Sequence, residues 1–421
     1  MTTTRPIDMV VFGATGFTGR HVVAYVKSLN DASLTVGIAG RSLGALQGVA
    51  KQVGIDWPVL VADVNDHKAL VAMARQATVV VNCVGPFRFS GRQVVAACIE
   101  AGTHYVDISG EPEFLESVQL EFDEEAQRRQ VVVVGSCGFD SVPSDIGALF
   151  VRQELAKRGA TTVASIECFI ALRSGPAGYV INFATYESAV FGIANAGNLR
   201  KIRRASSAKP SYARLDIVGP KVPVRSPYYF DERVGHWAVP FVGSDASVVR
   251  RTAASGAWAA SDSAPPCAQF VPYLAISSTV WLCLYLLLGS VFSVLARFRW
   301  GRYLLLKFPS VFSAGLVSRQ GPTEQQVKGT RFALTFFGKG YSKDAPTGNP
   351  PDVDVKAVCE GPDPGYRATS IAVVQCALVI CREKATMPTQ GGVLTPGAAF
   401  LGTSLIDRLH RNGITFTTAS K

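Results

Sequence analysis

The sequence predicts an α/β protein: a doubly wound parallel sheet at the N-terminus, followed by a second, α+β domain that carries an apolar segment. Six short apolar segments alternate with helical stretches over the first 150 residues, at 9–12, 34–39, 58–62, 78–84, 104–108 and 131–134. This alternation is typical of parallel strands joined by crossover helices. Strand patterns return at 163–172, 331–337 and 353–358, and a buried helix is expected at 368–381. Between these blocks, no charged residue occurs from Ser263 to Ala296.

The first predicted strand runs directly into a glycine-rich turn and then into a helix. The turn reads GATGFTG over 13–19, and the helical stretch follows at 20–29. Gly13 permits a tight turn, Gly16 lets the backbone approach a phosphate, and Gly19 lets the helix pack closely on the strand. Backbone N–H groups at such a helix N-terminus bind a pyrophosphate. We therefore predict a dinucleotide site formed by these glycines with Thr15 and Phe17, although the turn alone is also typical of an ordinary strand-to-helix connection.

The end of the second predicted strand indicates which dinucleotide binds. NAD-binding domains place an Asp or Glu here to bond the adenosine ribose 2′-hydroxyl, whereas this chain has Arg41 and Ser42. A guanidinium and a hydroxyl suit a 2′-phosphate, so we predict NADP(H) in preference to NAD(H). Other strand ends supply further cofactor contacts: Asp63 near the adenine, where it is also a candidate helix cap, and Asn82, Gly85 and Pro86 near the ribose and nicotinamide.

Two acidic residues at strand ends are the candidates for catalytic proton transfer. Glu111 lies in the turn SGEP (109–112) and Asp140 in the turn GFDSVP (138–143). An acidic residue just before a helix that starts with proline is commonly a cap for backbone N–H groups, so a structural role is the alternative for both. The nine cysteines form no C-x-x-C pair or Cys/His cluster, and we predict no metal site.

The uncharged stretch and the residues after it predict a membrane contact. Residues 273–295 are predominantly apolar, and a run of about 20 such residues can enter a bilayer core. The cations Arg297, Arg299, Arg302 and Lys307 follow before the next acidic residue, Glu324, and they suit anionic headgroups. We expect 263–307 to contact an anionic membrane surface as an inserted element, because a full crossing would separate the strand blocks on its two sides. A buried helix within the second domain is the alternative.

These patterns give the chain three parts. We expect an NAD(P)-binding domain of the Rossmann type at 1–150, an α+β domain made of 151–262 and 324–421, and an apolar, basic-flanked insertion at 263–323. The net charge is +10, and basic residues cluster within that insertion and at 200–204. They do not form the basic groove interleaved with aromatic residues that indicates a nucleic-acid partner. The first residues lack the apolar run of a signal peptide, and the unpaired cysteines fit a reducing, cytosol-facing location.

Several motifs together resemble the saccharopine dehydrogenase-like oxidoreductase family. They are VVFGATGFTG (10–19), AGRS (39–42), VNCVGPF (81–87), DISGEP (107–112) and GFDSVPSD (138–145), with further matches at 243–252, 319–323, 334–338 and 391–400. The resemblance implies a nucleotide-binding fold with the glycines at 13, 16 and 19. Because animal members are associated with lipid droplets, it also implies a membrane or lipid-droplet address. It implies no catalytic residue.

Two functions follow as alternatives. The first is an NADP(H)-dependent, saccharopine dehydrogenase-like oxidoreductase that transfers a hydride to or from a small-molecule or lipid-like substrate at a membrane or lipid-droplet surface. The second is a non-catalytic lipid-droplet or membrane protein that uses the Rossmann fold as a nucleotide-binding interaction module. The absence of a recognisable proton-donor motif in the sequence favours the second. Either could act as a monomer or as a homo-oligomer.

Overall fold

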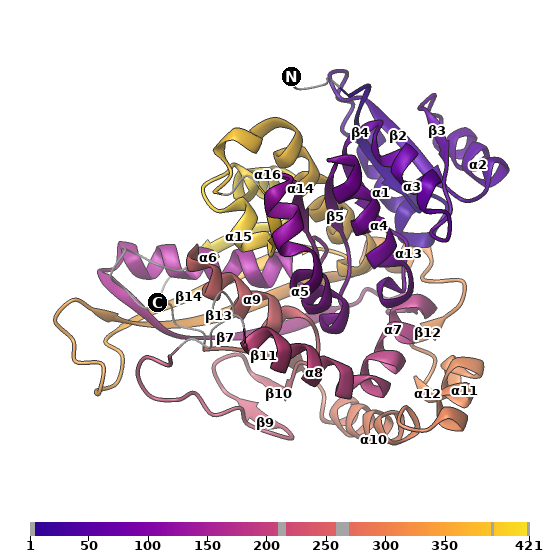
Figure 1. The fold of residues 1–421 in the computed structure, drawn as a ribbon. Coiled ribbons are helices and arrows are strands. Elements are labelled where there is room, and N and C mark those ends of the chain that lie inside the picture. The colour runs from indigo at the N-terminus through magenta and orange to yellow at the C-terminus, as the bar shows by residue number, and fades with distance from the viewer. Residues whose placement is uncertain (1–4, 209–215, 258–268, 389–390, 419–421) are drawn as a thin grey trace. The chain divides into compact units, whose positions relative to one another are not determined.

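The computed structural model describes residues 5–208, 216–257, 269–388 and 391–418 (Figure 1). Two compact units make up the chain. Unit 1 contains residues 1–142 and 365–412, and unit 2 contains residues 143–364 and 413–421. Each unit is therefore built from two separate stretches of the sequence.

A seven-stranded, fully parallel sheet forms the centre of unit 1. Its order is β15-β6-β5-β4-β1-β2-β3, which places β1 and β4 side by side as in dinucleotide-binding domains. The six strands that the sequence predicts are confirmed. The strands are β1 (Ile7–Phe12), β2 (Val36–Gly40), β3 (Val59–Val61), β4 (Ala77–Asn82), β5 (His104–Asp107), β6 (Val132–Val134) and β15 (Gly392–Leu394).

Helices connect these strands and begin at recognisable caps. Ser42 accepts from the N–H of Ala45 at the start of α2, and Asp66 accepts from the N–H of Ala69 at the start of α3, as side chains at helix N-termini do. Gly54 and Gly102 end α2 and α4 in the left-handed conformation. The helices are α1 (Phe17–Ser28), α2 (Leu43–Val53), α3 (His67–Ala74), α4 (Phe87–Ala101) and α5 (Pro112–Arg128).

The C-terminal stretch 365–412 corrects the predicted domain boundaries. The expected buried helix is α14 (Thr369–Glu383), but it packs on α1 and β4 of unit 1 rather than in the second domain. Its Gln375 donates to the Tyr25 hydroxyl (2.9 Å) and its Arg382 pairs with Asp31. The same stretch supplies β15, α15 (Pro396–Phe400) and α16 (Leu405–Arg411). An apolar helix predicts burial, but its pattern does not say which sheet it covers.

Helix α14 and the turn before it are also long and apolar enough to cross a membrane. The helical stretch Pro364–Thr386 meets that criterion, yet 83% of its most apolar window is buried inside the protein. Every residue from Thr369 to Ile380 is buried. It is thus a core helix of unit 1.

Unit 2 is an α+β unit with a mostly antiparallel sheet, as predicted. The order is β16-β14-β13-β7-β11-β10-β9, and only the β7–β11 pair is parallel. Helix α6 (Val142–Lys157) lies along it (Figure 1), so closely that a Cβ on Gly338 would come within 2.3 Å of Val151. The strands are β7 (Ala160–Arg173), β9 (Tyr229–Asp231), β10 (His236–Pro240), β11 (Phe270–Ile276), β13 (Arg331–Ser342), β14 (Val353–Pro362) and β16 (Thr415–Thr418); α9 (Asp245–Thr252) and α13 (Glu324–Gly329) accompany them.

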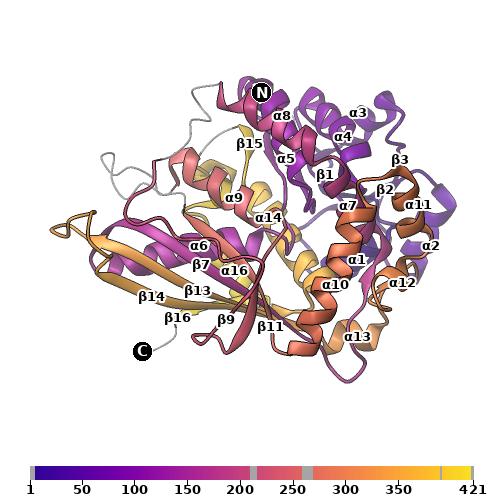
Figure 2. The ribbon, with the colours of Figure 1, turned by 90° about the horizontal axis from the view of Figure 1, so that it is seen from below.

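The remaining helices of unit 2 form what we call the helical lobe, residues 181–207 and 279–318. Figure 2 shows its helices α7, α10 and α11 next to one another. The lobe has a small apolar core of its own. Its elements are β8 (Ile181–Asn182), α7 (Phe183–Ala194), α8 (Ala196–Ser207), α10 (Thr279–Leu295), α11 (Arg299–Lys307), α12 (Pro309–Phe312) and β12 (Val317–Ser318).

The predicted insertion at 263–323 is corrected by β11. Residues 263–268 lie outside the described residues, and residues 270–276 form an inner strand of the unit 2 sheet, with Tyr273 fully buried. The apolar stretch is therefore a strand followed by a helix. Hydropathy does not distinguish the two elements, because a central strand and a surface-inserting helix can be equally apolar.

Candidate functional site

The glycine turn after β1 has the geometry of a phosphate cradle. Gly13 has a positive φ of 85°, and a Cβ on Gly19 would come within 2.1 Å of the Gly13 carbonyl oxygen. Gly16 is exposed and is the N-cap of α1, which has no acidic residue in its first turn. The N–H groups at this helix end therefore face no competing carboxylate from that turn, and a pyrophosphate fits there.

The predicted 2′-phosphate contacts lie at the same edge of the sheet. Arg41 and Ser42 follow β2 directly and are both exposed. Since β1 and β2 are parallel, their carboxyl ends share one edge with the glycine turn. Asp63, after β3, accepts from the N–H of Asn65 at 2.9 Å in a local turn. Direct contacts of these residues with the cofactor stay predictions.

The side chain of Asn82 is engaged within the protein, and its contact with the cofactor stays a prediction. It is fully buried; its Nδ2 donates to the Tyr105 hydroxyl at 3.0 Å, and its Oδ1 accepts from the N–H of Val84 at 3.0 Å. Both ends of the amide are thus engaged within the protein, where they shape the loop after β4. Gly85 and Pro86 lie on that loop, at the start of α4, and their contact with the cofactor stays a prediction.

A buried acidic residue that the sequence analysis does not single out holds the loops after β4, β5 and β6. Asp107, the last residue of β5, accepts from the N–H groups of Ser109 (2.9 Å) and Ser136 (2.8 Å) and from the Tyr105 hydroxyl (2.9 Å). Tyr105 in turn accepts from Asn82. Complete burial raises the pKa of Asp107 to about 6. The signal available in the sequence is its place at a strand end. The structure adds that it lies directly beside Asn82 in the strand register.

Glu111 caps a helix that is not its own. Its carboxylate accepts from the N–H groups of Phe87 (2.9 Å) and Arg88 (3.4 Å), at the start of α4, and from the Arg88 guanidinium (2.7 Å). Arg88 also pairs with Glu113. The capping alternative is therefore correct in kind, but the helix is α4 rather than α5. These contacts give Glu111 a structural role, and the structure offers no support for proton transfer by it.

Asp140 remains the better candidate for proton transfer. It lies on the loop after β6, where its Oδ2 would be 2.1 Å from a Cβ on Gly110, so this glycine allows the two loops to meet. The neighbouring Phe139 N–H donates to Thr369 at the start of α14 (3.1 Å). Burial raises the pKa of Asp140 above its usual value, which is the direction that favours a proton donor.

The C-terminal stretch also reaches the glycine turn. The ring of Tyr366 meets Phe17 edge-on with centroids 4.7 Å apart, and His21 lies 5.2 Å from it. Phe17 follows Gly16 directly, so the segment before α14 forms a wall beside the phosphate cradle. No local pattern in the sequence predicts this contact, because more than 340 residues separate the partners.

The strand order, the glycine cradle and the exposed Arg41 define a dinucleotide-binding domain of the Rossmann type. Residues 9–134 match the family model of the saccharopine dehydrogenase NADP binding domain. The chain is 39% identical to the saccharopine dehydrogenase-like oxidoreductase of Homo sapiens, covering 99% of this chain and 98% of that protein. It is 34% identical to the lipid droplet localized protein of Caenorhabditis elegans, covering 98% of each.

These comparisons show that the chain belongs to the saccharopine dehydrogenase-like oxidoreductase family, and its N-terminal unit carries an NADP(H)-binding domain. Among solved structures, apo saccharopine dehydrogenase (L-Glu forming) from Saccharomyces cerevisiae has a TM-score of 0.54 at 12% identity, covering 98% of this chain and 100% of that one. That likeness is one of fold.

Proposed function

We propose that this protein is an NADP(H)-dependent oxidoreductase that acts by hydride transfer on a lipid-like substrate, docked at a lipid-droplet or membrane surface through α10 and α11. The observation that carries the proposal is the surface of α10. Of its 17 residues, only Leu282 is buried. The name of the worm relative, lipid droplet localized protein, agrees with a surface of this kind.

Four of the exposed apolar side chains of α10 form a stripe. Val280, Leu287, Val291 and Val294 are 77%, 63%, 39% and 54% exposed. Their spacing of seven, four and three residues puts them on one side of the helix. A stripe of this kind inserts shallowly into a lipid surface. At 17 residues, α10 is shorter than the roughly 20 residues that cross a bilayer core.

Helix α11 adds charge and aromatic rings beside that stripe. Arg299 and Lys307 are exposed, as are Trp300 and Tyr303, at 60% each. Trp and Tyr side chains favour the headgroup level of a membrane, and Lys and Arg favour anionic headgroups. Together the two helices offer an apolar surface with a cationic margin, as a droplet monolayer requires.

The chemistry assigns separate tasks to residues of unit 1. A bound nicotinamide cofactor supplies the hydride. The glycine turn holds its pyrophosphate, Arg41 binds the 2′-phosphate, and Asp140 holds the proton that accompanies reduction of a carbonyl or an alkene. Asp107 fixes the loop after β6, which carries Asp140, by accepting from the Ser136 N–H.

The non-catalytic alternative has one observation in its favour. Glu111 is occupied by the α4 N–H groups and by Arg88, so only one of the two acidic residues that the sequence indicates for proton transfer, Asp140, is proposed as an acid. A nucleotide-binding module without turnover would need neither residue as an acid. Turnover therefore separates the two functions.

Flotation tests the docking surface. The variant Val280→Gln/Leu287→Gln/Val294→Gln keeps good helix formers on α10 and removes the apolar stripe. We expect the wild type to float with triolein emulsions coated with phosphatidylcholine and phosphatidylserine, and the variant to lose about tenfold or more of that binding. Val242→Gln, at an 88% exposed valine outside the lobe, is the matched control. Equal flotation of all three proteins would remove the docking surface from the account.

Consumption of NADPH tests the enzymatic part. With lipid fractions extracted from droplets, the wild type should oxidise NADPH in at least one fraction, and Asp140→Asn should lose turnover about a hundredfold or more while NADPH binding persists. Turnover in no fraction, with NADPH binding intact, would support the non-catalytic module instead.

A further inference from the structure

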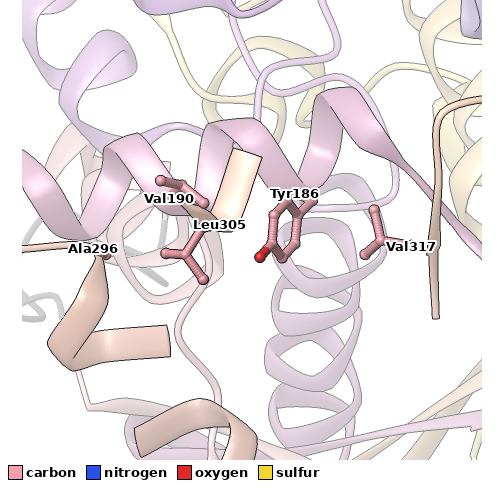
Figure 3. Close-up of a cluster of buried hydrophobic side chains, with 5 residues drawn as sticks. All are labelled: Tyr186, Val190, Ala296, Leu305 and Val317. Atoms are coloured by element: carbon pink, nitrogen blue, oxygen red, sulfur yellow. The ribbon is translucent and has the colours of Figure 1, made fainter. Parts of the chain in front are cut away.

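The apolar cluster at the core of the helical lobe includes one tyrosine. Its buried residues are Tyr186 and Val190 of α7, Ala296 after α10, Leu305 of α11 and Val317 of β12 (Figure 3). Phe292 and Leu295 of α10 pack against them from the partly buried rim. In Figure 3 the ring of Tyr186 lies between Leu305 and Val317, with its oxygen on the side of Leu305.

The hydroxyl of Tyr186 has no hydrogen-bond partner among the described residues. The side chain is only 8% exposed, and its ring meets Phe292 edge-on at 5.3 Å. An unsatisfied buried hydroxyl is costly, and a phenylalanine would fill the same space without that cost. Burial raises the pKa of Tyr186 to about 12, so at neutral pH the group is an O–H donor.

We propose that Tyr186 is the polar contact of a lipid-binding site inside the helical lobe, where its hydroxyl donates to a neutral oxygen of a single-chain lipid. The lipid class is a long-chain ester, ketone or alcohol, with its chain among α7, α10 and α11. This inference deepens the proposed function by naming the class of lipid and the residue that recognises it. It rests on the proposed lipid-like substrate, but not on hydride transfer.

The surroundings select a neutral oxygen. Tyr186 is part of an apolar cluster, and a carboxylate placed among those side chains would lose its hydration without gaining a counter-charge from them. One cation at the edge of the cluster, Arg319, lies 4.1 Å above the ring of Phe183 and donates to the Leu306 carbonyl oxygen at 2.6 Å. It is thus held at the rim rather than at the Tyr186 hydroxyl.

Helix α10 connects this core to the lipid surface. One side of α10 carries the exposed stripe of Val280, Leu287 and Val294, and its Phe292 and Leu295 contribute to the core. A lipid chain that leaves a monolayer beneath α10 can reach Tyr186 by moving along this one helix. Entry requires the contact between α10 and α7 to open, since the core is closed around the ring in this structure.

Equilibrium binding of soluble single-chain probes tests the site. Radiolabelled methyl palmitate, palmitate and hexadecane are delivered separately from cyclodextrin to the full-length protein, without droplets and without NADP(H). Tyr186→Phe keeps the ring and removes only the hydroxyl, so the fold is retained. Tyr228→Phe, at a 45% exposed tyrosine outside the lobe, is the matched control.

We expect wild type to bind methyl palmitate more tightly than palmitate. Tyr186→Phe should weaken methyl palmitate binding about fivefold to tenfold, as the loss of one hydrogen bond does, and leave hexadecane binding unchanged. Tyr228→Phe should change neither. The proposal is overturned if methyl palmitate does not bind, if Tyr186→Phe binds it as well as wild type does, or if Tyr228→Phe weakens it equally.

The lipid site and the proposed function can be refuted independently of each other. The α10 glutamine variant that leaves the droplet surface should still bind methyl palmitate from cyclodextrin, because its substitutions are on the outer stripe. Loss of flotation with binding retained therefore leaves this site in place. Flotation and turnover without any effect of Tyr186→Phe would remove the site and leave the proposed function standing.

Discussion

At the scale of single residues, Gly16 and Gly19 lack a side chain for different reasons. A Cβ on Gly19 would lie 2.1 Å from the Gly13 carbonyl oxygen, so this position cannot accept a side chain without moving the turn. A Cβ on Gly16 would lie 3.2 Å from the same oxygen, in an ordinary backbone conformation. Gly19 thus serves the fold, and we propose that Gly16 serves the ligand.

Substitutions at Gly16 should separate binding from folding. Gly16→Asp places a carboxylate where the pyrophosphate sits, so NADPH affinity should fall by about a hundredfold or more with little change in the thermal midpoint. Gly16→Ala, as the matched control, should cost only a few fold. Measurement is by NADPH fluorescence titration and thermal unfolding. A Gly16→Asp protein that binds NADPH normally would show that the turn is not the phosphate site.

Asp107 should make stability depend on pH. Its pKa is about 6 in the folded state against 3.8 for the ordinary group, so the folded state binds the proton more tightly. The free energy of unfolding should therefore fall by about 2–3 kcal/mol as the pH rises from about 4 to about 6. Asp107→Asn cannot titrate, so its curve should lack this fall. Urea unfolding of both proteins across this range measures the difference, and parallel curves would refute it.

At the scale of elements, α10 is held to unit 2 by few side chains. Leu282 is 2% exposed, whereas Val280, two residues earlier, is 77% exposed. Leu282→Ala should lower the free energy of unfolding by about 2–4 kcal/mol, and Val280→Ala should change it by less than about 0.5 kcal/mol. Chemical denaturation of both variants without lipid provides the comparison. Similar losses for both would mean that the outer stripe packs against protein in solution.

The elements that were predicted correctly are those with strong local signals. β1 to β6 are short apolar segments closed by turn residues, and β7, β13 and β14 keep their strand patterns, so period and punctuation sufficed. The same signals do not predict the strand within 270–295, because β11 and α10 form one continuous apolar run. Only pairing with β7 and β10 distinguishes the strand from the helix.

The site residues also divide into those with a local signal in the sequence and those without one. The glycine turn was predictable because backbone approach to a phosphate requires glycine at fixed spacing. The roles of Glu111 and Asn82 were not, because their partners, Arg88 and Tyr105, are more than 20 residues away. Tyr186 gave no signal in the sequence, since a buried phenol is identified only by what surrounds it.

At the scale of the whole molecule, both units are discontinuous in sequence. The C-terminal stretch 365–412 completes the sheet and core of unit 1, and residues 413–421 return to unit 2, where β16 pairs with β14. A chain cut after residue 364 would therefore leave α14 missing from the NADP(H)-binding unit. Each unit therefore includes residues that follow residue 364.

The most direct test of the account is a titration of wild type and Arg41→Ala with NADPH and with NADH, followed by nicotinamide fluorescence. Wild type should bind NADPH more tightly than NADH. Because a hydrogen bond to a charged group is worth about 1.5–3 kcal/mol, Arg41→Ala should weaken NADPH binding about tenfold to a hundredfold and leave NADH binding unchanged. Binding of neither cofactor by wild type, or an equal loss of both in Arg41→Ala, would contradict the account.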